Sequence, residues 1–194
     1  QGFRNYLNSE FYRPLGANLM GFCPLERFSR KQITPTENDL VFRKQIVHGY
    51  VHDPGASMLG GVCGHAGLFS NANDLAKLMQ MYLNGGSYGD KKFVKEKTVK
   101  YFTSCQECKN GNRRGLGFDK PETDTTKSGP TYEGVSADSY GHTGFTGTMA
   151  WVDPEYEIIY IFLSNRVYPD AVNNKIVEYN IRTEIQQVIY EAMK

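Results

Sequence analysis

Residues 148–163 contain two apolar segments that are separated by a turn sequence. Residues 148–152 are typical of a strand, and residues 153–156 (Asp-Pro-Glu-Tyr) place a proline at the second position of a β-turn. Residues 157–163 are apolar almost throughout, which predicts a strand that is buried on both faces. The whole segment therefore predicts an antiparallel hairpin.

A long amphipathic helix is expected to follow the hairpin, over residues 173–193. Its apolar face is formed by five residues, Val177, Ile181, Ile185, Val188 and Ala192. Two strands followed by such a helix indicate an α+β fold, in which a C-terminal helix packs across an antiparallel sheet.

The N-terminal half is expected to be helical and irregular. Residues 1–13 have apolar positions at helical spacing and precede a Pro-Leu-Gly stop, which predicts a helix. Residues 17–64 show little periodicity and contain several prolines and glycines, which predicts a long irregular stretch. A second helix is expected over residues 71–83, with Ser70 as its N-cap.

Residues 119–138 are rich in Thr, Ser, Gly and Pro and are predicted to form an exposed loop. This loop divides the chain into a helical and irregular part, residues 1–118, and a part with the strands and the C-terminal helix, residues 139–194. Residues 91–114 are basic and residues 119–157 are acidic, so the two segments are expected to be solvated faces that attract one another. The alternative for the basic segment is a ligand-binding patch, although it lacks the interleaved aromatic residues of a stacking surface.

The charge balance excludes some classes of function. The 194 residues include 22 Lys and Arg against 21 Asp and Glu, a formal charge of +1. A general nucleic-acid binder needs a surplus of basic charge, so no nucleic-acid partner is expected. No apolar run approaches the roughly 20 residues of a transmembrane helix, so no membrane span is expected either.

The cysteine spacing leaves several interpretations open. Cys105 and Cys108 have the spacing of a redox pair, of half a zinc site, or of a local disulfide in an oxidising compartment. The chain has no second motif of this kind, and its four histidines are remote in sequence. A structural role is therefore favoured for this pair.

The histidines do not predict a metal site. His48 and His52 are four residues apart and Asp53 follows, but a glycine and a proline within residues 48–54 argue against a helix that would align them. His65 lies between glycines and is expected to hydrogen-bond loop carbonyls. Neither a metal nor a cofactor is expected.

Residues 140–147 (Tyr-Gly-His-Thr-Gly-Phe-Thr-Gly) form the most distinctive motif. Three glycines weaken a strand, and they are explained if another group must approach the backbone closely. His142 and Thr143 offer a titratable ring and a hydroxyl between these glycines. The segment is either a bulged edge strand or a strand along which a substrate lies.

The chain resembles the serine β-lactamase and penicillin-binding-protein-like superfamily, in its class C and esterase-type branch. The resemblance depends on five motifs in the expected order, at residues 11–16, 60–70, 141–147, 151–154 and 163–169. It implies a partial β-lactamase/transpeptidase-like fold. It also implies a serine nucleophile with a lysine three residues later, a Tyr-x-Asn element and a Lys/His-Thr-Gly strand.

The third of these elements matches His142, Thr143 and Gly144. The resemblance implies that His142 orients the general base, that Thr143 bonds the polar end of the substrate, and that the Phe145 N–H donates to the oxyanion. It places Asn165 and Asp170 in the substrate-binding part of the site. A histidine where many β-lactamases have lysine, and a negative Asp170, favour an esterase or a peptidase over an enzyme that binds a β-lactam carboxylate.

The first two elements are absent. No serine of the sequence is followed three positions later by lysine, and Tyr6-Leu7-Asn8 and Tyr82-Leu83-Asn84 belong to predicted helices. We therefore expect a C-terminal fragment of a bacterial serine hydrolase, which is inactive alone and has the missing N-terminal part of the polypeptide as its partner. The alternative is a non-catalytic module or scaffold that binds a glycan or a peptide.

The resemblance carries two further expectations. Relatives with the pattern of residues 64–70 are sometimes fused to a glycoside hydrolase family 3 domain that acts on β-N-acetylglucosaminides, so the parent is expected to be bifunctional. Its substrate would be a small molecule, a peptide or a glycan of the cell wall. Such enzymes are exported, which implies a periplasmic or extracellular location.

Overall fold

The computed structural model describes residues 2–124 and 126–193, and its centre is a three-stranded antiparallel sheet. The strands are β5 (Tyr140–Thr143), β6 (Met149–Asp153) and β7 (Ile158–Phe162), in the order β5-β6-β7. Met149 pairs with Phe162 across β6 and β7, so the predicted hairpin is confirmed.

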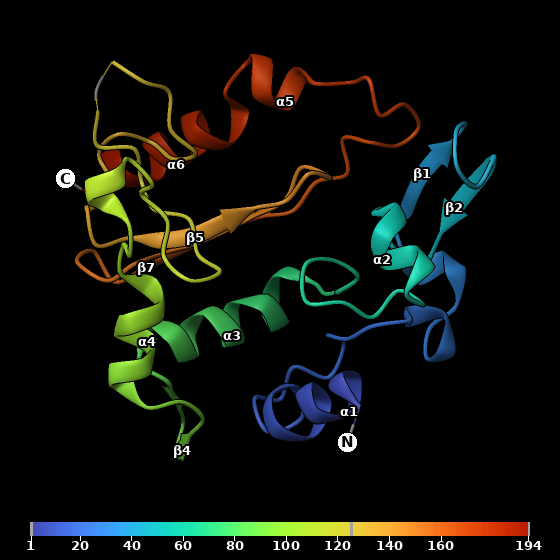
Figure 1. The fold of residues 1–194 in the computed structure, drawn as a ribbon, viewed down its shortest axis with the longest axis horizontal. Helices are drawn as coiled ribbons and strands as arrows, with labels where there is room; N and C mark the ends of the chain where they lie inside the picture. The colour runs from blue at the N-terminus through green and yellow to red at the C-terminus, as the bar shows by residue number, and fades with distance from the viewer. Residues whose placement is uncertain (1, 125, 194) are drawn as a thin grey trace.

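Helices cover both faces of this sheet (Figure 1). On one face, helix α3 (Ala72–Leu83) packs on β6 and β7 through a core that includes Met79, Tyr140 and Val152. On the other face, Trp151 is 1% exposed and the Tyr160 hydroxyl donates to the Arg182 carbonyl of helix α6 (Ile181–Glu191). Burial of these large side chains between three layers positions the sheet, because it removes apolar area from water.

The prediction that the second strand is buried on both faces is wrong. In β7 only Tyr160 is buried, and Leu163 after the strand is 43% exposed. Within the described residues β7 pairs with β6 alone, so its outer edge is free. Apolar composition predicted the strand correctly but could not tell a central strand from an edge strand.

The C-terminal helix differs from the prediction in two ways. Asn180, with φ of 50°, separates a short helix α5 (Lys175–Glu178) from α6. The face predicted to be buried points outward, since Val177, Ile185 and Val188 are 49%, 41% and 65% exposed. Gln186 and Tyr190 are buried instead, because polar partners hold them. The Gln186 side chain accepts from the Tyr132 N–H, and the Tyr190 hydroxyl donates to Asp153.

The N-terminal half begins with helix α1 (Phe3–Leu7), which continues into the π-helical turn η1 (Asn8–Tyr12), as predicted. Residues 17–64 are more ordered than expected. They contain an antiparallel hairpin, β1 (Pro35–Asp39) and β2 (Gln45–His48), and helix α2 (Pro54–Met58). The N-cap of α3 is Asn71, whose side chain accepts from the Asp74 N–H, and the prediction of Ser70 as N-cap is therefore wrong by one residue.

Short elements complete the chain. They are η2 (Pro24–Glu26), η3 (Arg30–Gln32), β3 (Ser87–Tyr88), β4 (Lys91–Lys92), α4 (Glu96–Thr103) and η4 (Cys108–Asn110). Cys105 and Cys108 form a disulfide next to η4. Among the described residues no helix has both the length and the apolar character needed to cross a bilayer.

The basic and acidic segments meet where the chain enters residues 119–138. The Arg113 guanidinium lies 3.1 Å from the Asp119 carboxylate, and that of Arg114 lies 3.7 Å away. This agrees with the expected attraction between the segments. The prediction that residues 119–138 form an exposed loop is only partly correct, because Lys120 and Ser136 are buried. Ser136 is buried because its N–H and hydroxyl donate to the carboxylate of Asp153.

Candidate functional site

The backbone of Thr143 at the end of β5 faces the outer edge of the sheet. Asp119 and Gly141 exchange two backbone hydrogen bonds on the side of β5 that faces away from β6. Because alternate residues of a strand bond to opposite sides, the N–H and C=O of Thr143 also point to this outer edge. His142 is exposed, and its Nδ1 lies 2.7 Å from the Thr143 carbonyl oxygen. An extended chain could therefore pair with β5 beyond Asp119.

A tight turn follows β5 and explains its glycines. Gly144 N–H donates to the Thr148 carbonyl at 2.8 Å, and Gly147 N–H donates to the Gly144 carbonyl at 3.0 Å. Gly147 has φ of 107°, and a side chain at Gly147 would collide with Ser164. A side chain at Gly141 would collide with Trp151 on β6. The group that approaches these glycines closely is thus the protein itself.

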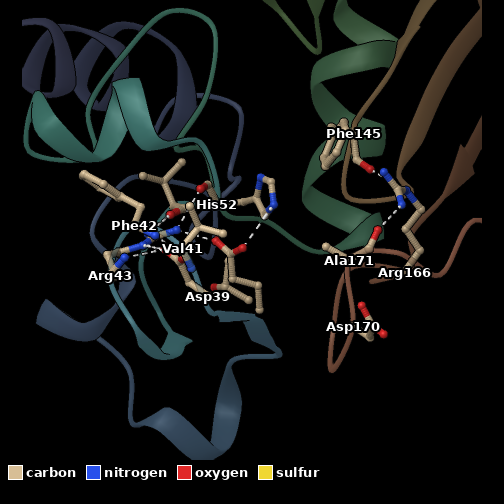
Figure 2. Close-up of polar contacts among 12 residues, drawn as sticks. Asp39, Val41, Phe42, Arg43, His52, Phe145, Arg166, Asp170 and Ala171 are labelled. Carbon is tan, nitrogen blue, oxygen red and sulfur yellow. Dashed lines mark hydrogen bonds and ion pairs between the residues drawn. The ribbon is translucent and has the colours of Figure 1, made fainter.

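Phe145 lies in this turn with its backbone N–H unpaired. Within the described residues no acceptor bonds this N–H. The side chain is 65% exposed, yet two side chains contact its ring. The His52 ring centroid lies 5.1 Å from that of Phe145, and the Arg166 guanidinium carbon lies 4.4 Å from it. Figure 2 shows Phe145 between these two partners, which come from distant parts of the chain.

Arg166 fastens the turn to the segment after β7. Its Nε donates to the Phe145 carbonyl at 2.8 Å, and its Nη1 donates to the Ala171 carbonyl at 3.1 Å (Figure 2). Its Nη1 also donates to the Asn173 carbonyl at 2.9 Å. Its own N–H donates to the Thr146 carbonyl at 2.9 Å. Arg166 belongs to the motif at residues 163–169, but no local pattern predicts its role, because its partners lie elsewhere in the sequence.

On the other side of Phe145, His52 belongs to a charged network under the β1–β2 hairpin. The Arg43 guanidinium bonds the carboxylates of Asp39 and Glu37 and the His52 carbonyl. The His52 Nε2 lies 3.4 Å from a Glu37 oxygen. The side chains of Glu37, Asp39 and Arg43 are mostly buried. Their ion pairs and the bond from Arg43 to the His52 carbonyl hold His52 where it contacts Phe145.

Asn165 lies partly buried against the β1–β2 hairpin, whereas Asp170 is exposed in the loop after β7. The Asn165 Nδ2 donates to the Pro35 carbonyl of β1, and its Oδ1 is buried without a partner among the described residues. Asn165 therefore links the segment after β7 to the β1–β2 hairpin. Asp170 is exposed, and its Oδ1 accepts from the Val172 N–H at 2.9 Å. His142, Thr143, Gly144 and Phe145 form one continuous edge, and Arg166 joins it to the Asp170 loop.

A cavity of about 180 Å³ lies between this turn and the C-terminal helices. Thr143, Gly144 and Phe145 line one side, and Ile176 and Arg182 are among the residues that line the other. Arg182 was also missed by the sequence analysis, since an arginine on a helix carries no local signal of a site.

The remaining histidines have separate structural contacts. The His48 Nε2 lies 2.6 Å from the Ile33 carbonyl, and the His65 Nε2 lies 3.1 Å from an Asp53 oxygen rather than from a loop carbonyl. Asp53 also caps α2 by accepting from the Ala56 N–H, and this bond, with the His65 contact, lowers the pKa of Asp53. In residues 2–124 and 126–193 no three His, Cys, Asp or Glu side chains gather in a way that could hold a metal.

The sequence matches the Beta-lactamase family over residues 1–180. It is 40% identical over 179 residues to a putative D-alanyl-D-alanine carboxypeptidase from Escherichia coli K12, covering 86% of this chain and 40% of that protein. It is 38% identical over 185 residues to a putative D-alanyl-D-alanine carboxypeptidase from Salmonella gallinarum, covering 88% of this chain and 42% of that protein. The chain thus spans about two fifths of the length of these relatives.

Two solved structures share the fold. A β-lactamase from Mycobacterium bovis is 19% identical with a TM-score of 0.55, covering 93% of this chain and 57% of its own. Simvastatin synthase (LovD) from Aspergillus terreus is 17% identical with a TM-score of 0.60, covering 96% of this chain and 50% of its own. The fold is therefore a partial β-lactamase/transpeptidase-like one, with helices around an antiparallel sheet.

Proposed function

Because this chain belongs to the Beta-lactamase family, we propose that it forms part of a serine acyl hydrolase, which cleaves an amide or ester bond through an acyl-enzyme. The unpaired N–H of Phe145, directly after His142-Thr143-Gly144, carries the proposal. A backbone N–H held in a fixed turn is the kind of donor that stabilises an oxyanion. The names of the relatives, putative D-alanyl-D-alanine carboxypeptidases, favour the amide bond of a peptide.

In this proposal the serine nucleophile comes from a part of the polypeptide outside residues 1–194. No serine in the sequence has a lysine three residues later. Two surfaces support the docking of a further segment: the free edge of β7, and the outward apolar face of α5 and α6 formed by Val177, Ile185 and Val188. Free strand edges and apolar helix faces are normally covered in a complete domain.

The proposal is tested with a fluorescent penicillin, which acylates serine hydrolases of this kind. We expect no labelling of the 194-residue chain. We expect one label per molecule in the longer polypeptide, on the serine of an upstream Ser-x-x-Lys motif, located by mass spectrometry. A Ser→Ala variant at that position is the matched control. Stoichiometric labelling of the 194-residue chain would refute the need for an external nucleophile. A longer polypeptide that lacks the motif and stays unlabelled would favour the non-catalytic binding module.

We also propose that the protein is exported. The Cys105–Cys108 disulfide supports this location, because disulfides persist in oxidising compartments. The expected fusion to a β-N-acetylglucosaminidase concerns a domain outside these residues. It is tested separately, by assaying the longer polypeptide on a chromogenic β-N-acetylglucosaminide, where a lack of hydrolysis would count against it.

A further inference from the structure

The aromatic ring of Phe145 contacts two side chains although it is 65% exposed. The centroid of the His52 ring lies 5.1 Å from that of Phe145, with an angle of 31° between the ring planes. The Arg166 guanidinium carbon lies 4.4 Å from the same Phe145 centroid (Figure 2). Ring stacking and cation–π contact both depend on geometry, so together they favour one orientation of the Phe145 ring.

The backbone around the Phe145 N–H has few restraints of its own. This N–H belongs to the peptide unit whose carbonyl, that of Gly144, accepts from the Gly147 N–H at 3.0 Å. Glycine has the greatest backbone freedom, so these two residues by themselves determine the orientation of the peptide unit only weakly. The contacts of the Phe145 ring add a restraint that the glycines cannot supply.

The backbone of His52 is held on both sides of the residue. The Arg43 guanidinium donates to the carbonyls of Val51 and His52, at 2.6 and 2.9 Å. The next residue, Asp53, is the N-cap of α2, and its carboxylate accepts from the Ala56 N–H at 2.7 Å. His52 therefore has a fixed place in the chain, between an arginine that bonds its carbonyl and the start of a helix.

The His52 ring is held as well. Its Nε2 lies 3.4 Å from a Glu37 oxygen, and the two side chains are 21% and 11% exposed. Arg43 bonds this Glu37 carboxylate and that of Asp39, so the carboxylate beside the ring is itself fixed. The charged network under the β1–β2 hairpin thus determines where the His52 ring meets Phe145.

We propose that His52 is a positioning residue for the reaction. Its ring, held by Glu37 and Arg43, keeps the Phe145 ring in place and thereby keeps the Phe145 N–H directed at the developing oxyanion. The inference rests on the proposed function for the use of this N–H, and it adds the β1–β2 hairpin to the elements on which the rate depends. His52 acts here without touching the substrate. A misplacement of about 1 Å costs roughly 100-fold in rate, so a contact at the ring is sufficient to control the donor.

The first test measures ¹⁵N relaxation of the Phe145 N–H in the 194-residue chain. We expect an order parameter of about 0.85 in the wild type, as in rigid backbone, and below about 0.6 in His52→Ala. His52→Phe keeps a planar ring and should restore most of the order. His48→Ala is the matched control, because His48 is also half-buried and lies in the same hairpin but contacts the Ile33 carbonyl. Its Phe145 order parameter should equal that of the wild type.

The second test measures acylation of the longer polypeptide by the fluorescent penicillin. His52→Ala should lower the rate at saturating penicillin roughly 10- to 100-fold, because an oxyanion donor acts in the transition state. The half-saturating concentration should change less than about twofold, since binding of the ground state does not use this donor. His52→Phe should recover most of the rate, and His48→Ala should react like the wild type.

Four results would overturn the inference. They are wild-type order at Phe145 in His52→Ala, an equal loss of order in His48→Ala, no recovery in His52→Phe, and a higher half-saturating concentration at an unchanged rate, which would assign His52 to substrate binding. Phe145→Leu removes the aromatic contact and leaves the network under the hairpin intact. It replaces His52→Ala if that variant fails to fold, and its residue 145 should lose the same order.

The two tests separate this inference from the proposed function. If the longer polypeptide stays unlabelled, the hydrolase is refuted, and the relaxation data still decide whether His52 holds the Phe145 N–H. If the longer polypeptide is labelled and His52→Ala reacts at the wild-type rate, the positioning role is refuted and the hydrolase stands.

Discussion

Replacement of Arg166 by alanine is expected to release the turn after β5 while the sheet stays folded. The side chain makes three hydrogen bonds, to the carbonyls of Phe145, Ala171 and Asn173, at 2.8, 3.1 and 2.9 Å. The first bond joins the turn that contains the unpaired Phe145 N–H to the loop after β7, and the other two lie within that loop. No other side chain among the described residues bonds the Phe145 carbonyl.

The size of the effect follows from the bond to the Phe145 carbonyl, since it is the one side-chain bond of Arg166 that breaks when the turn opens. It is worth about 1–1.5 kcal/mol net, at the low end for a charged donor because the guanidinium is partly solvated. Exchange of an amide that opens with the turn scales with the opening equilibrium. Since 1.4 kcal/mol is a factor of ten, exchange is expected to become roughly 5- to 10-fold faster.

The assay is hydrogen–deuterium exchange of backbone amides followed by NMR. We expect faster exchange of the N–H groups of Gly147 and residue 166, which bond within the turn, and unchanged exchange in β6 and β7. Arg166→Lys keeps the charge but has no Nε–H to donate to the Phe145 carbonyl, so it should show most of the effect. Arg13→Ala, at an exposed position, is the control. A uniform increase across the sheet, or no change at Gly147, would refute the assignment of Arg166 as the residue that positions the turn.

Two buried carboxylates, those of Asp39 and Asp153, lead to further predictions. The Arg43 guanidinium and three backbone N–H groups hold the pKa of Asp39 well below its usual value, so its stabilising effect is complete above about pH 4 and is lost as the pH falls. Between pH 4 and pH 2 the Tm of the wild type should therefore fall more steeply than that of Asp39→Asn, and parallel curves would contradict this. Asp153 is 1% exposed and accepts from Ser136 and Tyr190. Asp153→Ala should lower the free energy of unfolding in urea by about 3 kcal/mol, because it leaves buried donors unpaired; a loss under about 0.5 kcal/mol would contradict the network.

Local sequence signals predicted the elements, and contacts between distant residues determined how they pack. The hairpin was predictable because its turn and its apolar strands are encoded within residues 148–163. The buried face of α6 was not, because both faces of the helix contain apolar residues. The outcome depends on Gln186, which is polar and fully buried: its Oε1 accepts from the N–H of residue 132, and its Nε2 has no partner among the described residues. Hydrophobic periodicity predicts that a polar residue such as Gln186 faces the solvent.

The same distinction applies to the candidate site. His142, Thr143, Gly144 and Phe145 stand out because they are consecutive and lie between glycines. The side chains that contact the turn at the end of β5, including the positively charged Arg166, come from elsewhere in the chain. Contacts at Phe145 bring His52 from 93 positions earlier and Arg166 from 21 positions later. No spacing rule connects residues that only tertiary structure makes neighbours.

The charge of the site also depends on these distant neighbours. Taken by itself, β5 carries His142 where many β-lactamases have lysine, and this favours an esterase or a peptidase over an enzyme that binds a β-lactam carboxylate. The cavity next to the strand adds charge that no local pattern shows, because the side chains of Arg182 and Arg166 line its wall and come from a helix and a loop. A guanidinium stays protonated across the pH range in which proteins normally work. The charge around the end of β5 is therefore set by tertiary contacts and not by the residue at position 142 alone.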